Sequence, residues 1–212
     1  VLAANGVCRL TPHTAGLGHD PEAMATAVGP STRLVYIANP NNPTGTFLSK
    51  AALEGLLDRI PPGVVTVLDE AYYDYVTDPD HDTHIPFAVE DPRIVVARTF
   101  SKAYGMAGVR IGYAVGDAAT IKKMSAWRMP YNVNTFGVAA AIASLKDPQH
   151  IKDEVVRNTG VRDFTIKALA DLGFQTADSQ TNFIFTDIGK TMTAAAFRDA
   201  CAKHGVMVGR DF

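Results

Sequence analysis

Three short apolar runs, separated by turn clusters and amphipathic segments, constrain the fold of this chain more than any other feature. They occupy residues 34–38, 64–68 and 94–97, and polar residues follow each of them. A short apolar run bounded by turn residues predicts a strand buried on both faces, as in a parallel sheet. Because helical patterns alternate with these runs, the sequence predicts an α/β fold. Its central sheet should be mostly parallel, with helices on both faces.

Helix signals flank the predicted strands. The sequence Asp20-Pro21-Glu22 supplies an N-cap, a proline at the first helical position and an acid in the first turn, which predicts a helix to about Val28. A strand over 111–115 should be antiparallel or at an edge, because only a short link precedes it. The pattern predicts further helices over about 49–59, 117–127, 134–146, 148–172 and 193–204, a polar loop over 77–92, and short strands over 7–10, 182–185 and 206–208.

The character of the chain changes after Asp147-Pro148. A long segment rich in both charge signs follows, as expected of a partly exposed connecting helix. We therefore expect residues 1–148 to belong to a large domain whose N-terminal part is missing. Residues 149–212 should form part of a smaller α+β domain. The chain begins at Val1 without an initiator methionine and ends at Phe212 just after an expected strand, which suggests an internal piece of a longer protein.

Composition excludes several classes of function. The chain is 47% hydrophobic and 20% charged with a net charge of −2, which provides for a core but gives no basic surface for nucleic acid or anionic membranes. No apolar run approaches the roughly 20 residues that span a bilayer. Cys8 and Cys201 are far apart in the sequence and are expected to be free thiols. We therefore expect a cytoplasmic protein without nucleic-acid or membrane partners.

Two of the histidines invite a metal hypothesis. His81 and His84 lie among three aspartates, and these residue types bind metals. However, two prolines and a high density of charge in the same stretch favour an exposed loop. No metal site is predicted.

Polar residues with complementary chemistry follow the expected strands. Asn42 comes after the first strand, Asp69 ends the second, and residues 99–102 follow the third. Open α/β sheets bind ligands at the carboxyl ends of their strands, so these residues should meet. Asp69, at the end of a buried strand, needs a cationic partner or hydrogen bonds to stay ionised, and a protonated ring nitrogen would serve. Tyr72, three residues further on, would be able to hydrogen-bond a phenolate oxygen of a ligand.

Lys102, at the end of the 99–102 stretch, completes this set of polar residues. Lys102 is an amine suited to Schiff-base formation. Thr99, Ser101 and Arg110 would suit a phosphate, with the arginine giving a bidentate fork. A pyridinium nitrogen, a phenolate, an aldehyde and a phosphate together describe pyridoxal 5'-phosphate.

Each of these residues also has a structural interpretation. A lysine beside a serine is commonly solvated, and residues 39–45 are rich enough in proline and glycine to be a simple turn. Thr99 and Ser101 are also capping residues, and Arg110 is able to pair with a surface acid. Asn134 most often would cap the following helix, and Asn182 would bond the backbone.

The same residues resemble a known family. Residues 39–45 (NPNNPTG), 69–72 (DEAY), Ser101-Lys102 and 110–112 (RIG) resemble the cofactor signatures of the fold-type I, class I/II aminotransferases, in the family's order. Residues 130–134 (PYNVN) and 181–184 (TNFI) are similar to the histidinol-phosphate aminotransferase branch. The resemblance covers essentially the whole chain.

The resemblance implies roles for individual residues. Lys102 would form the Schiff base with pyridoxal phosphate, Asp69 would pair with the ring nitrogen, and Asn42 and Tyr72 would bond the ring oxygen. Lys102, Asp69 and Tyr72 would be catalytic. The cofactor phosphate would bind Thr99, Ser101 and Arg110. Candidate substrate-binding residues are Asn182 and Arg210, the latter in an Arg-Asp motif that differs from the family pattern by Gly209.

The implied reaction moves an amino group from an amino acid or amino phosphate, such as histidinol phosphate, to a 2-oxo acid. The full-length protein would be a homodimer, as in the family. Two alternatives stay open: a phospho-amino-acid decarboxylase of the same fold, and a ligand-sensing domain of a transcription regulator built on it.

Overall fold

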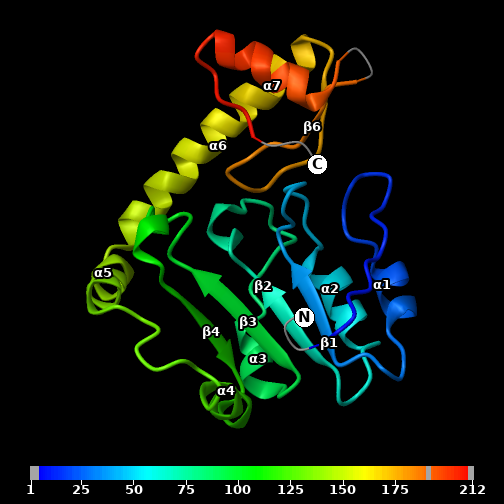
Figure 1. The fold of residues 1–212 in the computed structure, drawn as a ribbon, viewed down its shortest axis with the longest axis vertical. Helices are drawn as coiled ribbons and strands as arrows, with labels where there is room; N and C mark the ends of the chain where they lie inside the picture. Colours follow the sequence, from blue (N-terminus) through cyan, green and yellow to red (C-terminus); the bar gives the residue numbers. More distant parts are fainter. Residues whose placement is uncertain (1–4, 190–191, 210–212) are drawn as a thin grey trace.

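A four-stranded sheet forms the centre of the computed structural model, which describes residues 5–189 and 192–209 (Figure 1). Its strands are β1 (Leu34–Ala38), β2 (Val65–Asp69), β3 (Ile94–Thr99) and β4 (Gly112–Gly116), in the order β1-β2-β3-β4. The first three are parallel, and β4 runs antiparallel at the edge. The predicted mostly parallel sheet is confirmed. The antiparallel edge strand is confirmed too, because the link between β3 and β4 holds no crossover helix.

Most helices begin where the sequence predicts a capping residue. The helices are α1 (Pro21–Ala27), α2 (Lys50–Leu57), α3 (Ile85–Glu90), α4 (Ala118–Ser125), α5 (Thr135–Leu145), α6 (Pro148–Asp171) and α7 (Ala194–Lys203). The Asp20 carboxylate accepts the backbone N–H groups of Glu22 and Ala23, both at 3.0 Å, which satisfies donors that have no partner within α1. None of the described helices is both long and apolar enough to cross a membrane.

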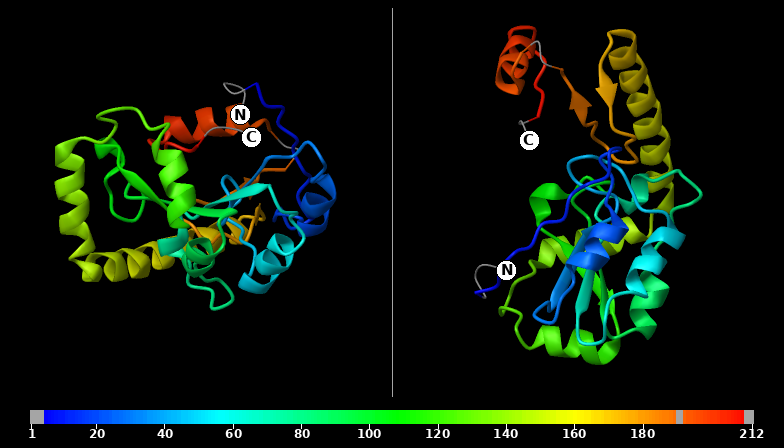
Figure 2. Two further views of the ribbon diagram at one scale, coloured as in Figure 1. Left: turned by 90° about the horizontal axis from the view of Figure 1, so that it is seen from below. Right: turned by 90° about the vertical axis from the view of Figure 1, so that its right-hand side faces the viewer.

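The hydrophobic core lies on one face of the sheet, under α2 and α3 (Figure 2). Strand alternation sends Ile37, Leu68 and Val96 to this face, and each is 0% exposed. They pack against Leu53 and Leu56 of α2, together with residues of α1 and α3. This packing fixes the three parallel strands in register.

The opposite face of β1 is open to solvent in the described chain. Leu34 is 47% exposed and Tyr36 is 56% exposed. The prediction that this strand is buried on both faces is therefore wrong here. The alternating side chains of β1 place Leu34 and Tyr36 away from the core, on a face that the described residues leave uncovered.

A smaller unit follows at the far end of α6 (Figure 1). It contains α7 and the antiparallel pair β5 (Gln175–Thr176) and β6 (Thr186–Asp187). The strand predicted over 182–185 is wrong, since pairing begins at Thr186. The Ser179 and Thr181 hydroxyls donate to the Phe183 carbonyl at 2.6 and 3.1 Å, so local side-chain bonds replace a ladder there.

Two other predicted strands, over 7–10 and 206–208, are also wrong. Val7 is 94% exposed and Met207 is 86% exposed, and neither segment pairs with a described strand. A strand forms only where a partner takes its backbone hydrogen bonds, and sequence pattern does not reveal the partner.

The predicted polar loop over 77–92 contains α3. The expectation of an exposed loop is wrong for His84, which is 1% exposed at the start of this helix. The segment folds inward because the Glu70 carboxylate accepts the His84 backbone N–H at 2.8 Å and the Thr83 hydroxyl at 2.9 Å. Buried acceptors of this kind order a segment whose composition alone predicts exposure.

Candidate active site

The carboxyl ends of β1, β2 and β3 meet at one edge of the sheet, below the unit formed by α6 and α7 (Figure 1). The ladder continues past the strands, with Asn39 N–H donating to the Asp69 carbonyl and Glu70 N–H to the Ala97 carbonyl, both at 2.9 Å. Asn42, Asp69 and the 99–102 segment all emerge from this edge. The predicted convergence of these segments is therefore observed.

Asp69 is held through both carboxylate oxygens. Its Oδ1 accepts the Ala71 backbone N–H at 3.0 Å, and its Oδ2 accepts the phenol of Tyr36. Burial, and then the neighbouring carboxylate, raise the pKa of Tyr36, so the phenol keeps its proton and acts as the donor. No local pattern in the sequence points to Tyr36, because its contact with Asp69 depends on the register of two strands.

Tyr72 is the centre of a second group. The Asn42 amide donates to its phenol oxygen at 3.1 Å, and the Lys102 amine lies 5.0 Å from its ring centroid. Phe183 meets the same ring edge-to-face at 5.0 Å. Tyr72 is 6% exposed, so these contacts hold its hydroxyl in place. An amide, a phenol and an amine that are far apart in the sequence thus converge on one ring.

The predicted phosphate ligands lie at the end of β3, where Thr99 is the last residue, and on the segment that follows it. The Ser101 backbone N–H donates to the Thr99 hydroxyl at 3.1 Å. Arg110 adopts a left-handed backbone conformation with φ of 59°, and its guanidinium donates to the Ala107 carbonyl at 2.6 Å. The described contacts join Thr99 to Ser101 and bond Arg110 to its own turn. Its guanidinium is exposed.

Asn134 supports that turn. Its side-chain oxygen caps α5 by accepting the Gly137 N–H at 2.7 Å, and its amide donates to the Val109 carbonyl at 2.9 Å. The capping interpretation of Asn134 is therefore confirmed.

The loop at 39–45 docks against the smaller unit. Gly45 has φ of +78°, and a Cβ there would lie 2.2 Å from the Ser179 Oγ. The Gln180 N–H also donates to the Gly45 carbonyl at 2.9 Å. Glycine is required at this position for two reasons: its φ is positive, and there is no space for a Cβ beside Ser179. Asn182, two residues further on, is exposed, and Arg210 lies outside the described residues.

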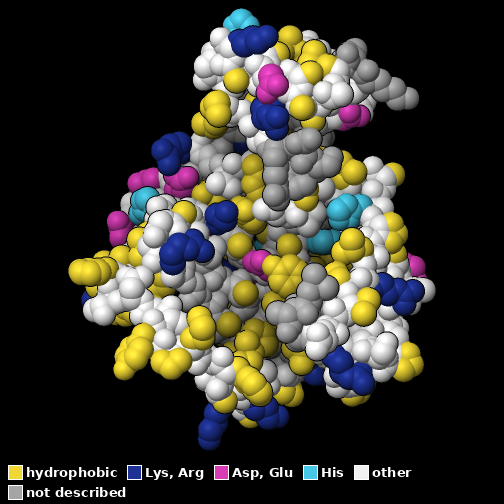
Figure 3. Space-filling view, viewed as in Figure 1, with side chains coloured by type: hydrophobic (Ala, Val, Ile, Leu, Met, Phe, Trp, Pro, Cys, Tyr) yellow, Lys and Arg dark blue, Asp and Glu magenta, His cyan; other side chains and the backbone are white. Residues whose placement is uncertain are grey.

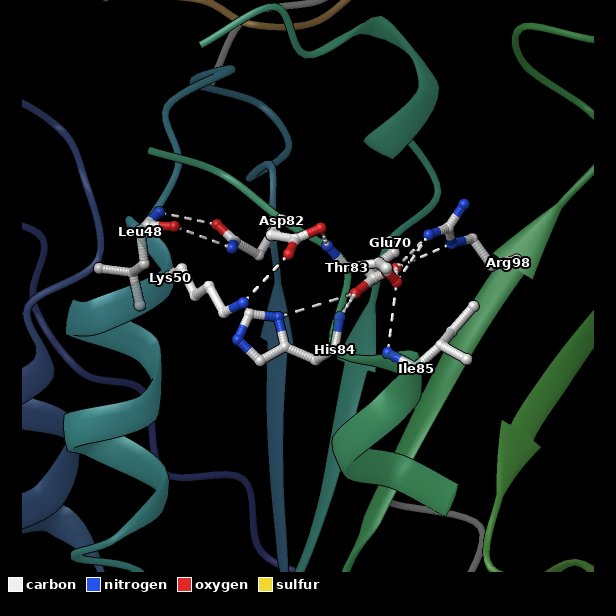
Figure 4. Close-up of polar contacts among 9 residues, drawn as sticks. Leu48, Lys50, Glu70, Asp82, Thr83, His84, Ile85 and Arg98 are labelled. Carbon is white, nitrogen blue, oxygen red and sulfur yellow. Dashed lines mark hydrogen bonds and ion pairs between the residues drawn. The ribbon is translucent and has the colours of Figure 1, made fainter. Parts of the chain in front are cut away.

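A buried ion pair joins Glu70, which directly follows β2, to Arg98 of β3 (Figure 4). Arg98 Nη2 lies 2.6 Å from Glu70 Oε2, its Nε donates to the same oxygen at 2.8 Å, and the two side chains are 10% and 2% exposed. Each residue is the neighbour of a site residue, Asp69 or Thr99. The pair links the ends of β2 and β3.

The donor set fits pyridoxal phosphate. A carboxylate has about four lone-pair sites. Asp69 uses two in the hydrogen bonds described, which leaves capacity for a ring N–H. The Asn42 amide and the Tyr72 phenol lie 3.1 Å apart, and each has a polar hydrogen that this bond does not use. Lys102 forms no ion pair with any described residue. Hydroxyls and a guanidinium suit a phosphate.

Known proteins with similar sequences and structures agree with this chemistry. The model of the family described as aminotransferase class I and II matches residues 3–211. Histidinol-phosphate aminotransferase 2 of Methylococcus capsulatus is 42% identical over 191 residues, covering 90% of this chain and 51% of the relative. The aromatic amino acid aminotransferase of Nocardia farcinica is 41% identical over 206 residues, covering 96% of this chain and 57% of the relative.

A solved structure shares the fold. The histidinol-phosphate aminotransferase from Sinorhizobium meliloti, crystallised with pyridoxal-5'-phosphate, superposes with a TM-score of 0.84 at 33% identity. The match covers 93% of this chain and 54% of that one. This chain thus has the fold of the fold-type I enzymes, and spans about half the length of the curated relatives it matches.

Proposed function

Because the chain belongs to the aminotransferase class I and II family, we propose that the full-length protein is a pyridoxal-phosphate-dependent aminotransferase. Its amino donor would be histidinol phosphate or a related amino acid, and its acceptor a 2-oxo acid. The observation that carries the proposal is the convergence of Asn42 and Lys102 on Tyr72, beside Asp69 at the same sheet edge.

Each residue of the site would hold one part of the cofactor. Asp69 would bind the ring nitrogen, Asn42 and Tyr72 the ring oxygen, and Lys102 the aldehyde carbon. The phosphate would be bound by Thr99 at the end of β3 and by Ser101 and Arg110 in the segment that follows. When bound, pyridoxal phosphate supplies an electron sink for negative charge at the substrate Cα.

The protein side chains supply the remaining chemistry. The Nζ amine of Lys102 is the base that takes the proton from the donor Cα, and it returns a proton when the acceptor is aminated. Asp69 keeps a positive charge on its ring partner, and Tyr72 orients the ring through its phenol. Asn182 and Arg210 are proposed to contact the substrate.

The proposal extends to the organisation of the whole protein. Residues 1–148 would be part of the large cofactor-binding domain, and residues 149–212 part of the small domain. The full-length protein would be a cytoplasmic homodimer active in amino-acid biosynthesis, without nucleic-acid or membrane partners. In support of a second copy, Figure 3 shows hydrophobic side chains gathered over α4, α5 and the loop between them, where Trp127 is 90% and Phe136 87% exposed.

Borohydride trapping tests the assignment of the lysine. Full-length protein loaded with pyridoxal phosphate should be reduced to a stable adduct, and mass spectrometry of its peptides should place the adduct on Lys102. A matched K122A variant, which removes a lysine of α4, should retain the adduct while K102A loses it. An adduct on another lysine in the wild-type protein would refute the assignment.

Product analysis tests the reaction itself. Donors with imidazole phosphate and aromatic side chains should exchange their amino group with a 2-oxo acid, and no carbon dioxide should be released. Carbon dioxide release without dependence on a 2-oxo acid would instead identify a decarboxylase.

A further inference from the structure

Tyr36 is the one side chain that donates a hydrogen bond to the Asp69 carboxylate in the described part of the chain. Asp69 pairs with Ala38 in the β1–β2 ladder, and Tyr36 precedes Ala38 by two residues. Because side chains alternate along a strand, Tyr36 and Asp69 lie on the same face as diagonal neighbours. The phenol of Tyr36 donates to Asp69 Oδ2, while the Ala71 N–H holds Oδ1 at 3.0 Å.

Packing does not explain the position of Tyr36. The residue is 56% exposed and is absent from the hydrophobic core, which lies on the other face of the sheet. Its polar end, in contrast, is committed to a carboxylate in a charge-assisted hydrogen bond, which is stronger than a neutral one. The chemistry of the contact is therefore directed at Asp69.

We propose that Tyr36 is a positioning residue for Asp69, which fixes the carboxylate in one orientation and leaves its free lone pairs for the cationic N–H of a bound cofactor ring. The inference rests on the proposed function. A carboxylate at a strand end is free to rotate about its last torsion. Two donors on different oxygens remove that freedom, so the ring nitrogen would meet a preorganised acceptor.

The phenol also shares the negative charge of Asp69. Groups that hydrogen-bond a ligating carboxylate typically change ligand affinity by about 10- to 100-fold when they are removed, as measured at metal sites. One donor of the two remains in a Y36F variant, so we expect the lower end of that range.

The test uses full-length protein and pyridoxal phosphate labelled with ¹⁵N in the ring. Y36F should bind the cofactor about tenfold more weakly, and the ¹⁵N signal should move toward that of an unprotonated ring. The thermal stability of the cofactor-free protein should stay at the wild-type value.

Y113F is the matched control. Tyr113 is 40% exposed on β4 and pairs with Arg98, which places it on the face opposite Asp69. Its variant should leave both the affinity and the ¹⁵N signal unchanged.

A double-mutant cycle separates an effect through Asp69 from a general one. In a D69N background, Y36F should cause little further loss of affinity. An equal loss in both backgrounds, or a Y36F protein that matches wild type in affinity and ¹⁵N signal, would overturn the inference. Failure of the proposed function would be visible in the wild-type protein alone, as absence of cofactor binding or an adduct away from Lys102.

Discussion

Loss of the charge on Glu70 should destabilise the protein strongly. Its carboxylate is 2% exposed and accepts from Arg98 Nε at 2.8 Å, the Thr83 hydroxyl at 2.9 Å and the His84 N–H at 2.8 Å. A glutamine of the same shape keeps an acceptor for His84 and offers its amide to Thr83. It cannot balance the guanidinium of Arg98, which is 10% exposed and has one other carboxylate nearby, that of Asp74 at 3.9 Å from Nη1.

The expected magnitude follows from the burial of the pair. Removing one partner of a buried ion pair costs about 3–5 kcal/mol when the other charge stays buried without compensation. Because Asp74 partly compensates Arg98, we expect the lower end of this range, about 3 kcal/mol. With a typical urea m-value of about 2 kcal/mol/M, the unfolding midpoint of E70Q should fall by about 1.5 M. The m-value itself should not change if the native state stays compact.

The assay is urea unfolding of the full-length protein followed by circular dichroism. E22Q is the matched control, since Glu22 also forms a two-bond pair with an arginine, at 2.6 and 2.9 Å, but its side chain is 74% exposed. Its midpoint should not change measurably.

Removing both charges should restore stability. In E70Q/R98M the buried guanidinium is gone. The Asp74 carboxylate, which loses Arg98 as a partner at 3.9 Å, is 18% exposed, so the double variant should still be more stable than E70Q alone. The reasoning would be refuted if E70Q lowered the midpoint no more than E22Q, or if E70Q/R98M were less stable than E70Q.

Two further predictions concern stability. G45A should destabilise more than G63A by at least about 1 kcal/mol in urea unfolding. Both glycines have positive φ, but of the two only Gly45 has a neighbour that a Cβ would meet, the Oγ of Ser179 at 2.2 Å. Equal losses of unfolding free energy in G45A and G63A would contradict this prediction. The free energy of unfolding should fall as pH is lowered from about 8 to about 5. Burial lowers the pKa of three histidines in the folded protein, whereas the same histidines in the unfolded chain take up protons near their ordinary pKa of 6.5. A free energy of unfolding that does not change over this pH range would contradict the prediction. The three are His19, His81 and His84.

Local signals in the sequence predicted the framework well. Asp20 caps α1 as expected, because a capping residue acts on backbone donors only two or three positions away. The antiparallel direction of β4 followed from the length of its link to β3. The residues proposed to bind the cofactor came from motifs, and the structure brings Asn42, Tyr72 and Lys102 together.

Errors arose where a partner from a distant segment decides the outcome. Residues 7–10 and 206–208 are apolar enough for strands, but no described strand lies beside them. The 77–92 segment looked exposed because its charges were counted without Glu70, which draws His84 inside. Neither kind of partner is visible in a local pattern.

The sequence by itself therefore determined the alternation of strands and helices, their caps, and the identity of Lys102 as the proposed attachment point, since these depend on residues within a few positions. Only the tertiary structure decided what surrounds the apolar strands. The contacts of Tyr36 with Asp69 and of Arg98 with Glu70 span 33 and 28 residues. Such contacts depend on strand register, which is set by the packing of the core on the far face of the sheet.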